Sequence, residues 1–472
     1  MGELAGRLPS AVRPAAGRRG ATRRAVLGRA GQVAAGVGLA PLAAAVAGCA
    51  VGGPPPGATR EVRTLEVYTG FSEGRMGEAI VKVLRHFDQT VGERLGYRAQ
   101  HVLVPWGEMH TKVQTVVAGG TPPAAFRGWS RSIPVLAPSG ALTALDPFVQ
   151  KDKDWNGADI WPSTVEEMQL GGKTYGAPIS SQVDFLYFNK GLLRQAGLDP
   201  GQPPADLDGW VQWGEKTTEL GPERSIVRAG FLPPVIGDLL TWGTVFGGRF
   251  YDPPAQKATL THPGVVRMLE WQKTFVDRWG AKPIADFIAA YSADGWGRKS
   301  RDGAYYTGRF VAWVQAVWLY NDVREFGPSV DFGVAPVPPP KGAQAPPGVT
   351  RVNHYLMPAG APQPEGAWAL LKYMSKDPYV TEHKVLVDSV PPSRRSLATD
   401  RRFEAQAPWL KMARDDILPK AVTHPMIPNL EFLQSQLSGA LAAVRRAEKA
   451  PRQALEDAQQ AVQVDLEQKL KR

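Results

Sequence analysis

The sequence predicts an α/β fold with two lobes. Two observations carry this prediction: strand and helix patterns alternate along the first folded stretch, and the chain after its leader is too long for one ordinary core. Polarity alternates over residues 64–68, and apolar residues then recur at helical spacing as far as Val91. A strand pattern at 101–104 and a helix pattern at 109–117 repeat this order. Such alternation favours a largely parallel sheet.

The rest of the chain continues the pattern less regularly. Residues 187–189 lead from a strand into a short helix that ends at Gly197, and the proline- and glycine-rich stretch 334–347 predicts a surface loop. Two amphipathic helices are expected at the end of the chain. Their apolar faces are Leu430, Leu433, Leu437, Leu441 and Val444 in the first, and Leu455, Val462, Leu466 and Leu470 in the second.

Residues 1–48 have the layout of an export signal. Seven arginines precede a stretch without charge at 31–48, and Arg23 and Arg24 lie in a segment that resembles the twin-arginine signal. The general secretion route stays open, because a second arginine pair precedes this one. A transmembrane anchor is the alternative, but alanine and glycine make the stretch only weakly apolar.

Cys49 follows this leader directly and is the only cysteine of the chain. Residues 46–49 resemble the bacterial lipobox, so Cys49 is expected to carry the lipid of a membrane-attached, extracytoplasmic protein. A free cysteine placed there by chance is the alternative. The glycine- and proline-rich residues 49–61 are expected to form a flexible tether.

The charge balance argues against a nucleic-acid partner. The leader holds seven of the 55 Lys and Arg residues and one of the 45 Asp and Glu residues, which leaves 48 against 44. A weak positive balance spread over such a length lacks the basic stripe of a nucleic-acid-binding protein.

Motifs of catalysis and cofactor binding are missing from the sequence. No HExxH, G-x-S-x-G, P-loop or G-x-G-x-x-G after a strand occurs, and a lone cysteine cannot build a multi-cysteine metal cluster. We therefore predict no catalytic residue, no metal site and no cofactor. Two carboxylates facing each other across a cleft, as in a glycosidase, stay open as the enzymatic alternative.

Tryptophan is the more informative residue type, since all 14 tryptophans follow the leader. Trp129, Trp242 and Trp318 lie near turns or follow strand patterns. Flat indole faces suit the apolar faces of sugar rings, while neighbouring polar side chains can bind hydroxyl groups. For any one tryptophan, packing in the core is the alternative.

Nine ordered blocks together resemble the extracellular solute-binding proteins of the sugar-binding type, the group that includes maltose-binding protein. Ala124 stands where that family usually has aspartate, and Ala316-Val317-Trp318 departs from its usual Gly-Pro/Ser-Trp. The blocks are residues 118–123, 172–190, 196–204, 247–248, 308–310, 331–336, 356–368, 390–394 and the two closing helices.

The resemblance implies a periplasmic-binding-protein-like fold of type II, with two discontinuous α/β lobes joined by a hinge. Lobe 1 comprises 62–176 and 350–390, and lobe 2 comprises 177–349 and 391–472. The chain is expected to cross near 177–181, 348–353 and 389–394. By analogy, the ligand-binding residues are Phe71, Ser72, Glu73, Trp129, Gln182, Asp184, Trp242, Trp318 and Asn353.

The function implied by this resemblance is that of a monomeric substrate-binding lipoprotein of an ABC importer. The protein would capture a mono- or oligosaccharide between its lobes and deliver it to permease subunits in the membrane. A polyol phosphate, polyamine or peptide as solute, a secreted glycosidase, and a signalling lipoprotein without a transport role remain alternatives.

Overall fold

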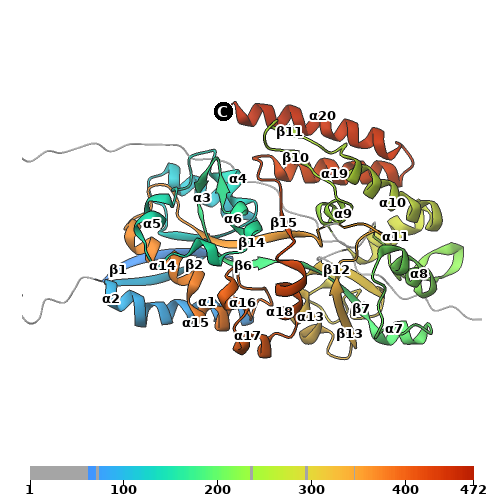
Figure 1. The fold of residues 1–472 in the computed structure, drawn as a ribbon, viewed down its shortest axis with the longest axis horizontal. Helices are drawn as coiled ribbons and strands as arrows, with labels where there is room; N and C mark the ends of the chain where they lie inside the picture. The colour runs from blue at the N-terminus through green and yellow to red at the C-terminus, as the bar shows by residue number, and fades with distance from the viewer. Residues whose placement is uncertain (1–61, 71–73, 234–237, 293–295, 345, 472) are drawn as a thin grey trace, which may run out of the picture. The chain divides into compact units, whose positions relative to one another are not determined.

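The computed structural model describes residues 62–70, 74–233, 238–292, 296–344 and 346–471 (Figure 1). The predicted export signal and tether, and the predicted ligand residues Phe71, Ser72 and Glu73, lie outside these ranges. Within the described ranges, no helix is both long and apolar enough to cross a membrane. The same ranges contain no cluster of three or more His, Cys, Asp or Glu side chains suited to a metal ion.

The first of the two main sheets has six strands. Strand β14 is central, pairing antiparallel with β3 and β6 and parallel with β15, while β1 pairs parallel with both β3 and β2. The strands are β1 Arg63–Thr69, β2 Tyr97–Leu103, β3 Ala125–Trp129, β6 Gly176–Gln182, β14 Val349–Leu356 and β15 Val422–Thr423.

Helices cover both faces of this sheet. Leu65 and Val67 of β1 pack in one cluster with helices α1 (Gly74–Phe87) and α14 (Pro364–Lys376). Tyr68, which points to the other face, packs with α3 (Met109–Ala118) and α4 (Ser132–Leu136). Successive side chains of a strand point to opposite faces, so a strand buried on both sides requires helices on both sides.

Two predictions about this sheet need correction. Strands β1, β2 and β3 are parallel as expected, but β14 runs antiparallel to β3 and β6, so the sheet is mixed. The range 177–182, assigned to lobe 2 from the sequence, lies in strand β6 of the first sheet. Pairing along almost the whole of β14 holds these residues there.

The second main sheet has three antiparallel strands in the order β12-β7-β13: Ala312–Ala316, Asp184–Asn189 and Phe332–Pro336. Residues 185–188 of β7 are all buried and belong to one large core cluster. The predicted surface loop is wrong at its start, because Val334 to Pro336 belong to β13 and pair with β7.

Further helices lie around both sheets (Figure 1). The closing helices, α19 Leu430–Arg445 and α20 Pro451–Leu470, confirm the prediction and pack against each other (Figure 1). Leu470, predicted on the apolar face, is exposed at the end of α20. The remaining α-helices are α2 Glu93–Leu95, α5 Asp146–Lys151, α6 Pro162–Glu167, α7 Lys190–Gln195, α8 Leu207–Thr217, α9 Leu239–Val245, α10 Pro263–Trp279, α11 Ala281–Tyr291, α13 Leu319–Phe326, α15 Pro378–Val380, α16 Arg395–Ala398, α17 Arg401–Gln406 and α18 Trp409–Met412.

Single turns and short hairpins complete the described elements. The 3-10 and π turns are η1 Asp88–Gly92, η2 Trp106–Glu108, η3 Gly157–Asp159, η4 Pro222–Arg224, η5 Thr381–Val385 and η6 Ala413–Ile417. The hairpins are β4 Gln169–Leu170 with β5 Lys173–Thr174, β8 Glu219–Leu220 with β9 Ile226–Arg228, and β10 Tyr251–Asp252 with β11 Lys257–Ala258.

Candidate functional site

The candidate site lies where the chain passes from the first sheet to the second. Strand β6 of the first sheet ends at Gln182 and β7 of the second sheet begins at Asp184, so Val183 is the one residue between these two strands. Val183 is fully buried, whereas Gln182 and Asp184 on either side of it line a cavity. This is the alternation expected of a continuous extended segment.

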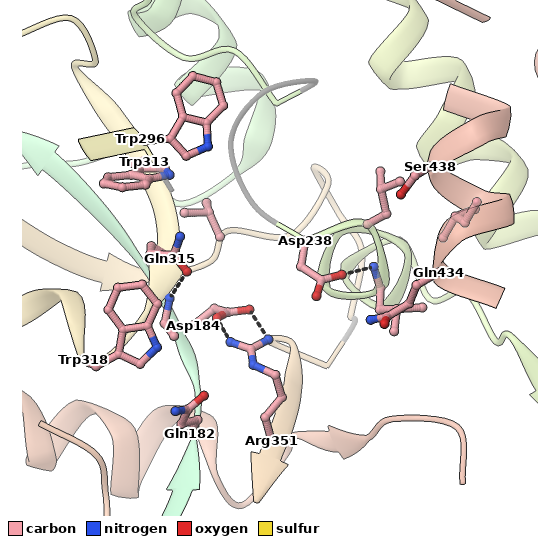
Figure 2. A pocket seen from close by; sticks show the side chains of 15 residues that line it. Gln182, Asp184, Asp238, Trp296, Trp313, Gln315, Trp318, Arg351, Gln434 and Ser438 are labelled. Carbon is pink, nitrogen blue, oxygen red and sulfur yellow. Dashed lines mark hydrogen bonds and ion pairs between the residues drawn. The ribbon is translucent and has the colours of Figure 1, made fainter. Parts of the chain in front are cut away.

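The cavity has a volume of about 500 Å³. Figure 2 shows Trp296, Trp313 and Trp318 on one side of it, and Asp238, Gln434 and Ser438 on the other. The complete lining is Gln182, Asp184, Asp238, Leu239, Leu240, Trp296, Trp313, Val314, Gln315, Ala316, Trp318, Arg351, Gln434, Leu437 and Ser438.

An ion pair between the two sheets forms part of the wall. Arg351 of β14 donates from both terminal nitrogens to Asp184 of β7, with Nη1 at 3.1 Å from Oδ2, and Thr241 Oγ1 donates to the same oxygen at 2.6 Å. Burial opposes the charge on Arg351, but the Asp184 carboxylate outweighs it and raises the pKa of the guanidinium. The Asp184 side chain is 3% exposed, so this pairing satisfies a carboxylate that is almost fully removed from water.

The aromatic wall is rigid on its protein side. Trp313 is 1% exposed, and its ring lies 5.7 Å from that of Phe310, which also contacts Trp296 edge-on at 5.1 Å. The guanidinium carbon of Arg298 lies 4.0 Å from the ring centroid of Trp318 and covers one face of that indole. These contacts hold the aromatic rings in place without a ligand.

Asp238 is the second carboxylate of the lining. One of its oxygens accepts a hydrogen bond from the backbone N–H of Leu240 at 2.7 Å and so caps helix α9. Burial raises the pKa of the Asp238 carboxyl, while the charge of Arg351 and the Leu240 N–H oppose this shift. In the part of the chain that the structure describes, no cationic nitrogen forms an ion pair with Asp238.

The comparisons with known proteins identify the family. A family model described as bacterial extracellular solute-binding protein matches residues 89–411, well over half of the chain. The chain belongs to this solute-binding family. As a member of it, the protein acts outside the cytoplasm, and the family is one of binding proteins rather than enzymes.

Individual relatives of the solute-binding protein are distant in sequence. A protein of Brucella abortus named as a binding protein is 23% identical over 370 residues, covering 78% of this chain and 85% of its own length. The mannitol-binding protein of Pseudomonas aeruginosa is 22% identical over 322 residues, covering 63% of this chain and 67% of its own.

A solved structure gives the matching fold. The structure of CpMnBP1 with mannotriose bound has a TM-score of 0.69 at 24% identity, and the match covers 85% of this chain and all of that one. This likeness confirms the predicted periplasmic-binding-protein-like fold.

Three of the predicted ligand residues meet at the cavity of the solute-binding protein: Gln182, Asp184 and Trp318 all line it. Asn353 lies nearby on β14, where its side-chain amide donates to Ser180 Oγ at 3.0 Å. Trp242 is placed differently, because its ring is fully buried in the core, 5.3 Å from the ring of Trp271. Its indole is therefore not part of this cavity wall.

Trp129 lies in an aromatic cluster at the end of β3. Its ring stacks on His110 at 4.4 Å and meets Trp106 edge-on at 5.4 Å. A Cβ added to Gly70 would lie 2.4 Å from the Trp106 ring, so this close approach requires glycine at the end of β1. Arg131, two residues after Trp129, donates to Gln434 Oε1 of the cavity wall at 3.2 Å.

Sequence reasoning missed several lining residues, most clearly Arg351 and Asp238. A signal for Arg351 was present, since it is the only Arg, Lys, Asp or Glu residue in an otherwise buried strand. Asp238 was visible only as a residue that precedes a helix, which is equally the signature of a cap. The wall residues Trp296, Trp313, Gln315 and Gln434 had no distinguishing signal.

A buried carboxyl ties together the segments next to Arg351. Glu167, the last residue of α6, accepts from the backbone N–H of Val352 at 2.8 Å and from Thr423 Oγ1 of β15 at 3.3 Å. Burial raises the pKa of the Glu167 carboxyl to about 7, although its hydrogen bonds and the charge of Arg351 act to lower it. Strand β14 is thus anchored on both sides of the point where Arg351 reaches the second sheet.

Proposed function

We propose that this protein is the substrate-binding lipoprotein of an ABC importer and captures a carbohydrate between two lobes. The observation that carries the proposal is the cavity at the junction of β6 and β7, where three indoles face amide, hydroxyl and carboxylate groups. The protein delivers the captured solute, without changing it chemically, to permease subunits in the membrane.

The chemistry of the lining favours a polyhydroxylated solute. Indole faces pack against the C–H faces of sugar rings, and Gln182, Gln315 and Ser438 offer both donors and acceptors for hydroxyl groups. Arg298 covers one face of Trp318, so the solute packs on the other face. The cavity volume of about 500 Å³ suits a small saccharide. Relatives named for mannitol and bound to mannotriose support the same class.

We take the two sheets as the cores of the two lobes. The chain passes from the first sheet to the second at Val183 and returns between β13 and β14, and the third crossing is expected near residues 389–394. Solute that contacts both lobes favours the arrangement in which they are close together, and the permease recognises that arrangement. The Arg351–Asp184 pair joins β14 of the first sheet to β7 of the second, next to the crossing at Val183.

The predicted lipid at Cys49 holds the protein at the outer surface of the membrane, and Arg23 and Arg24 direct its export. A Cys49→Ala variant is expected to leave the membrane fraction, because two or more acyl chains provide the attachment. Fractionation followed by immunoblotting measures this, with Thr59→Ala in the predicted tether as the matched control. Retention of Cys49→Ala in washed membranes would refute the lipid anchor.

A thermal-shift and calorimetric screen tests the carbohydrate assignment. Mannitol, mannobiose, mannotriose, maltose and glucose are compared with spermidine and a tripeptide, and a ligand at a hundred times its Kd should stabilise the protein by about 2.7 kcal/mol. Trp318→Ala should weaken binding of the best saccharide by about tenfold or more, because a ring contact is lost. Trp213→Ala, which removes a partly buried indole of the same core outside the cavity, should leave Kd unchanged. Binding of spermidine or the peptide alone would overturn the assignment.

A further inference from the structure

We infer that the carboxylate of Asp238 makes this cavity select uncharged or cationic polyhydroxylated solutes and reject anionic ones, such as sugar acids and sugar phosphates. The inference deepens the proposed carbohydrate-binding function and rests on it. It identifies a residue that sets specificity by charge.

The charged groups of the lining do not cancel. The described residues of the wall include three charged side chains, namely Asp184, Asp238 and Arg351. Arg351 gives both terminal nitrogens to Asp184, and that carboxylate also accepts from Thr241. Because both terminal nitrogens of this guanidinium bind one carboxylate, its positive charge is balanced by Asp184 and it is poorly placed to bind a second anion. The wall therefore retains one negative charge, at Asp238.

Asp238 has acceptor capacity left for a ligand. A carboxylate offers about four lone-pair positions, and the Leu240 N–H occupies one of them. In Figure 2 the side chain lies between the aromatic wall and helix α19, on the cavity side of its helix. Hydroxyl groups and ammonium groups can donate to such an oxygen. A solute carboxylate or phosphate cannot, and like charges that approach in a poorly hydrated site repel strongly.

The other cations around the cavity do not reverse this balance. Arg131 is joined to Glu431 at 3.5 Å and to Gln434, and Arg298 is joined to Asp322 at 2.6 Å. Each of these arginines therefore contacts a carboxylate, although Asp322 also pairs with Arg75. Burial also raises the pKa of Asp238, which indicates a site where water screens charge weakly.

The test compares neutral, amino and acidic derivatives of one skeleton on the full-length protein. The probes are mannose, mannosamine and mannuronic acid, glucose, glucosamine and glucuronic acid, and mannitol with mannitol 1-phosphate, measured by calorimetry at pH 8 to keep Asp238 ionised. We expect the acidic member of each binding series to bind about tenfold to hundredfold more weakly than the neutral member. The amino member should bind at least as well as the neutral one.

Asp238→Asn separates charge from structure. Asparagine keeps an oxygen that can accept from Leu240 N–H, so α9 stays capped, and the discrimination against the anion should fall by about tenfold or more. Asp252→Asn, an exposed aspartate on β10, is the matched control and should preserve the discrimination. If Asp238→Asn fails to fold, Asp238→Ser, which also caps a helix, replaces it.

The outcomes separate the two levels of the proposal. An acidic derivative that binds as tightly as its neutral parent, or discrimination unchanged in both Asp238 variants, overturns the charge selection and leaves carbohydrate binding intact. If no probe of any series binds while spermidine or a peptide does, the carbohydrate assignment fails, and the inference fails with it.

Discussion

The Asp388→Asn variant is expected to lose about 3–5 kcal/mol of unfolding free energy. Asp388 accepts from Lys384 Nζ at 2.5 Å and from Arg127 Nη2 at 3.4 Å. Lys384 is fully buried and Arg127 is 3% exposed. Removing the carboxylate charge leaves two buried like charges close together, a situation that costs far more than the loss of a surface pair.

The same variant should show a distinctive pH dependence. Burial lowers the pKa of Lys384 to about 8, although the Asp388 carboxylate opposes this, so removing that carboxylate lowers the pKa further. At pH values between the pKa of Lys384 in the folded protein and its ordinary pKa of 10.5, the unfolded chain binds more protons than the folded protein. The contribution of Lys384 to the free energy of unfolding therefore rises with pH in this range. Urea unfolding at pH 7 and pH 9.5 should therefore show a smaller deficit at the higher pH.

Asp457→Asn provides the control for this measurement. Asp457 pairs with Lys449 on the exposed side of α20, and its side chain is 44% exposed, so no measurable loss of stability is expected. A deficit at Asp388 no larger than that of the control, or one that grows at pH 9.5, contradicts the account of buried like charges.

Replacing Arg351 with methionine should destabilise the protein by about 3 kcal/mol. Methionine fills much of the volume, but the Asp184 carboxylate then keeps only the hydroxyl of Thr241 among these partners while its side chain stays 3% exposed. A double variant, Asp184→Asn with Arg351→Met, removes both charges and should recover part of the loss. Urea denaturation of the four proteins gives the coupling energy directly.

Arg452→Met is the matched control for this cycle. It breaks a pair with Glu456 whose side chains are 69% and 45% exposed, and little change is expected. The coupling energy between Asp184 and Arg351 could prove as small as the effect of breaking this exposed pair. In that case the ion pair between the two sheets does not stabilise the fold.

Periodicity predicted individual helices and strands, whereas the periplasmic-binding-protein-like arrangement was predicted from the family resemblance. The helices α1, α3, α19 and α20 were recognised because each buries a single apolar stripe against its neighbours. Strand direction was harder. The sequence of β14 is that of an ordinary buried strand. No local pattern indicates that it pairs antiparallel with β3, from which it is separated by more than 200 residues. Such pairings are set by the whole fold.

The site was predicted in part for a similar reason. Gln182 and Asp184 came from a recognisable block, whereas Arg351 is separated from its partner Asp184 by 167 residues. Trp242, which precedes Gly243, and Trp318, which follows a strand pattern, were both predicted from the sequence to contact the ligand. Only the packing distinguishes them: Trp242 is enclosed by other aromatic rings, and Trp318 lines the cavity.

The single residue between β6 and β7 limits which insertions and deletions the protein can tolerate at this connection. Gln182 and Asp184 share the cavity because one buried residue separates them, and side chains alternate with a period of two. Inserting or deleting one residue at Val183 would shift the alternation by one position. The Asp184 side chain would then point into the core, and its hydrophobic neighbours along β7 would be exposed. Natural length variation is therefore expected in the surface connections and not at this joint, where only a change of two residues would preserve the alternation.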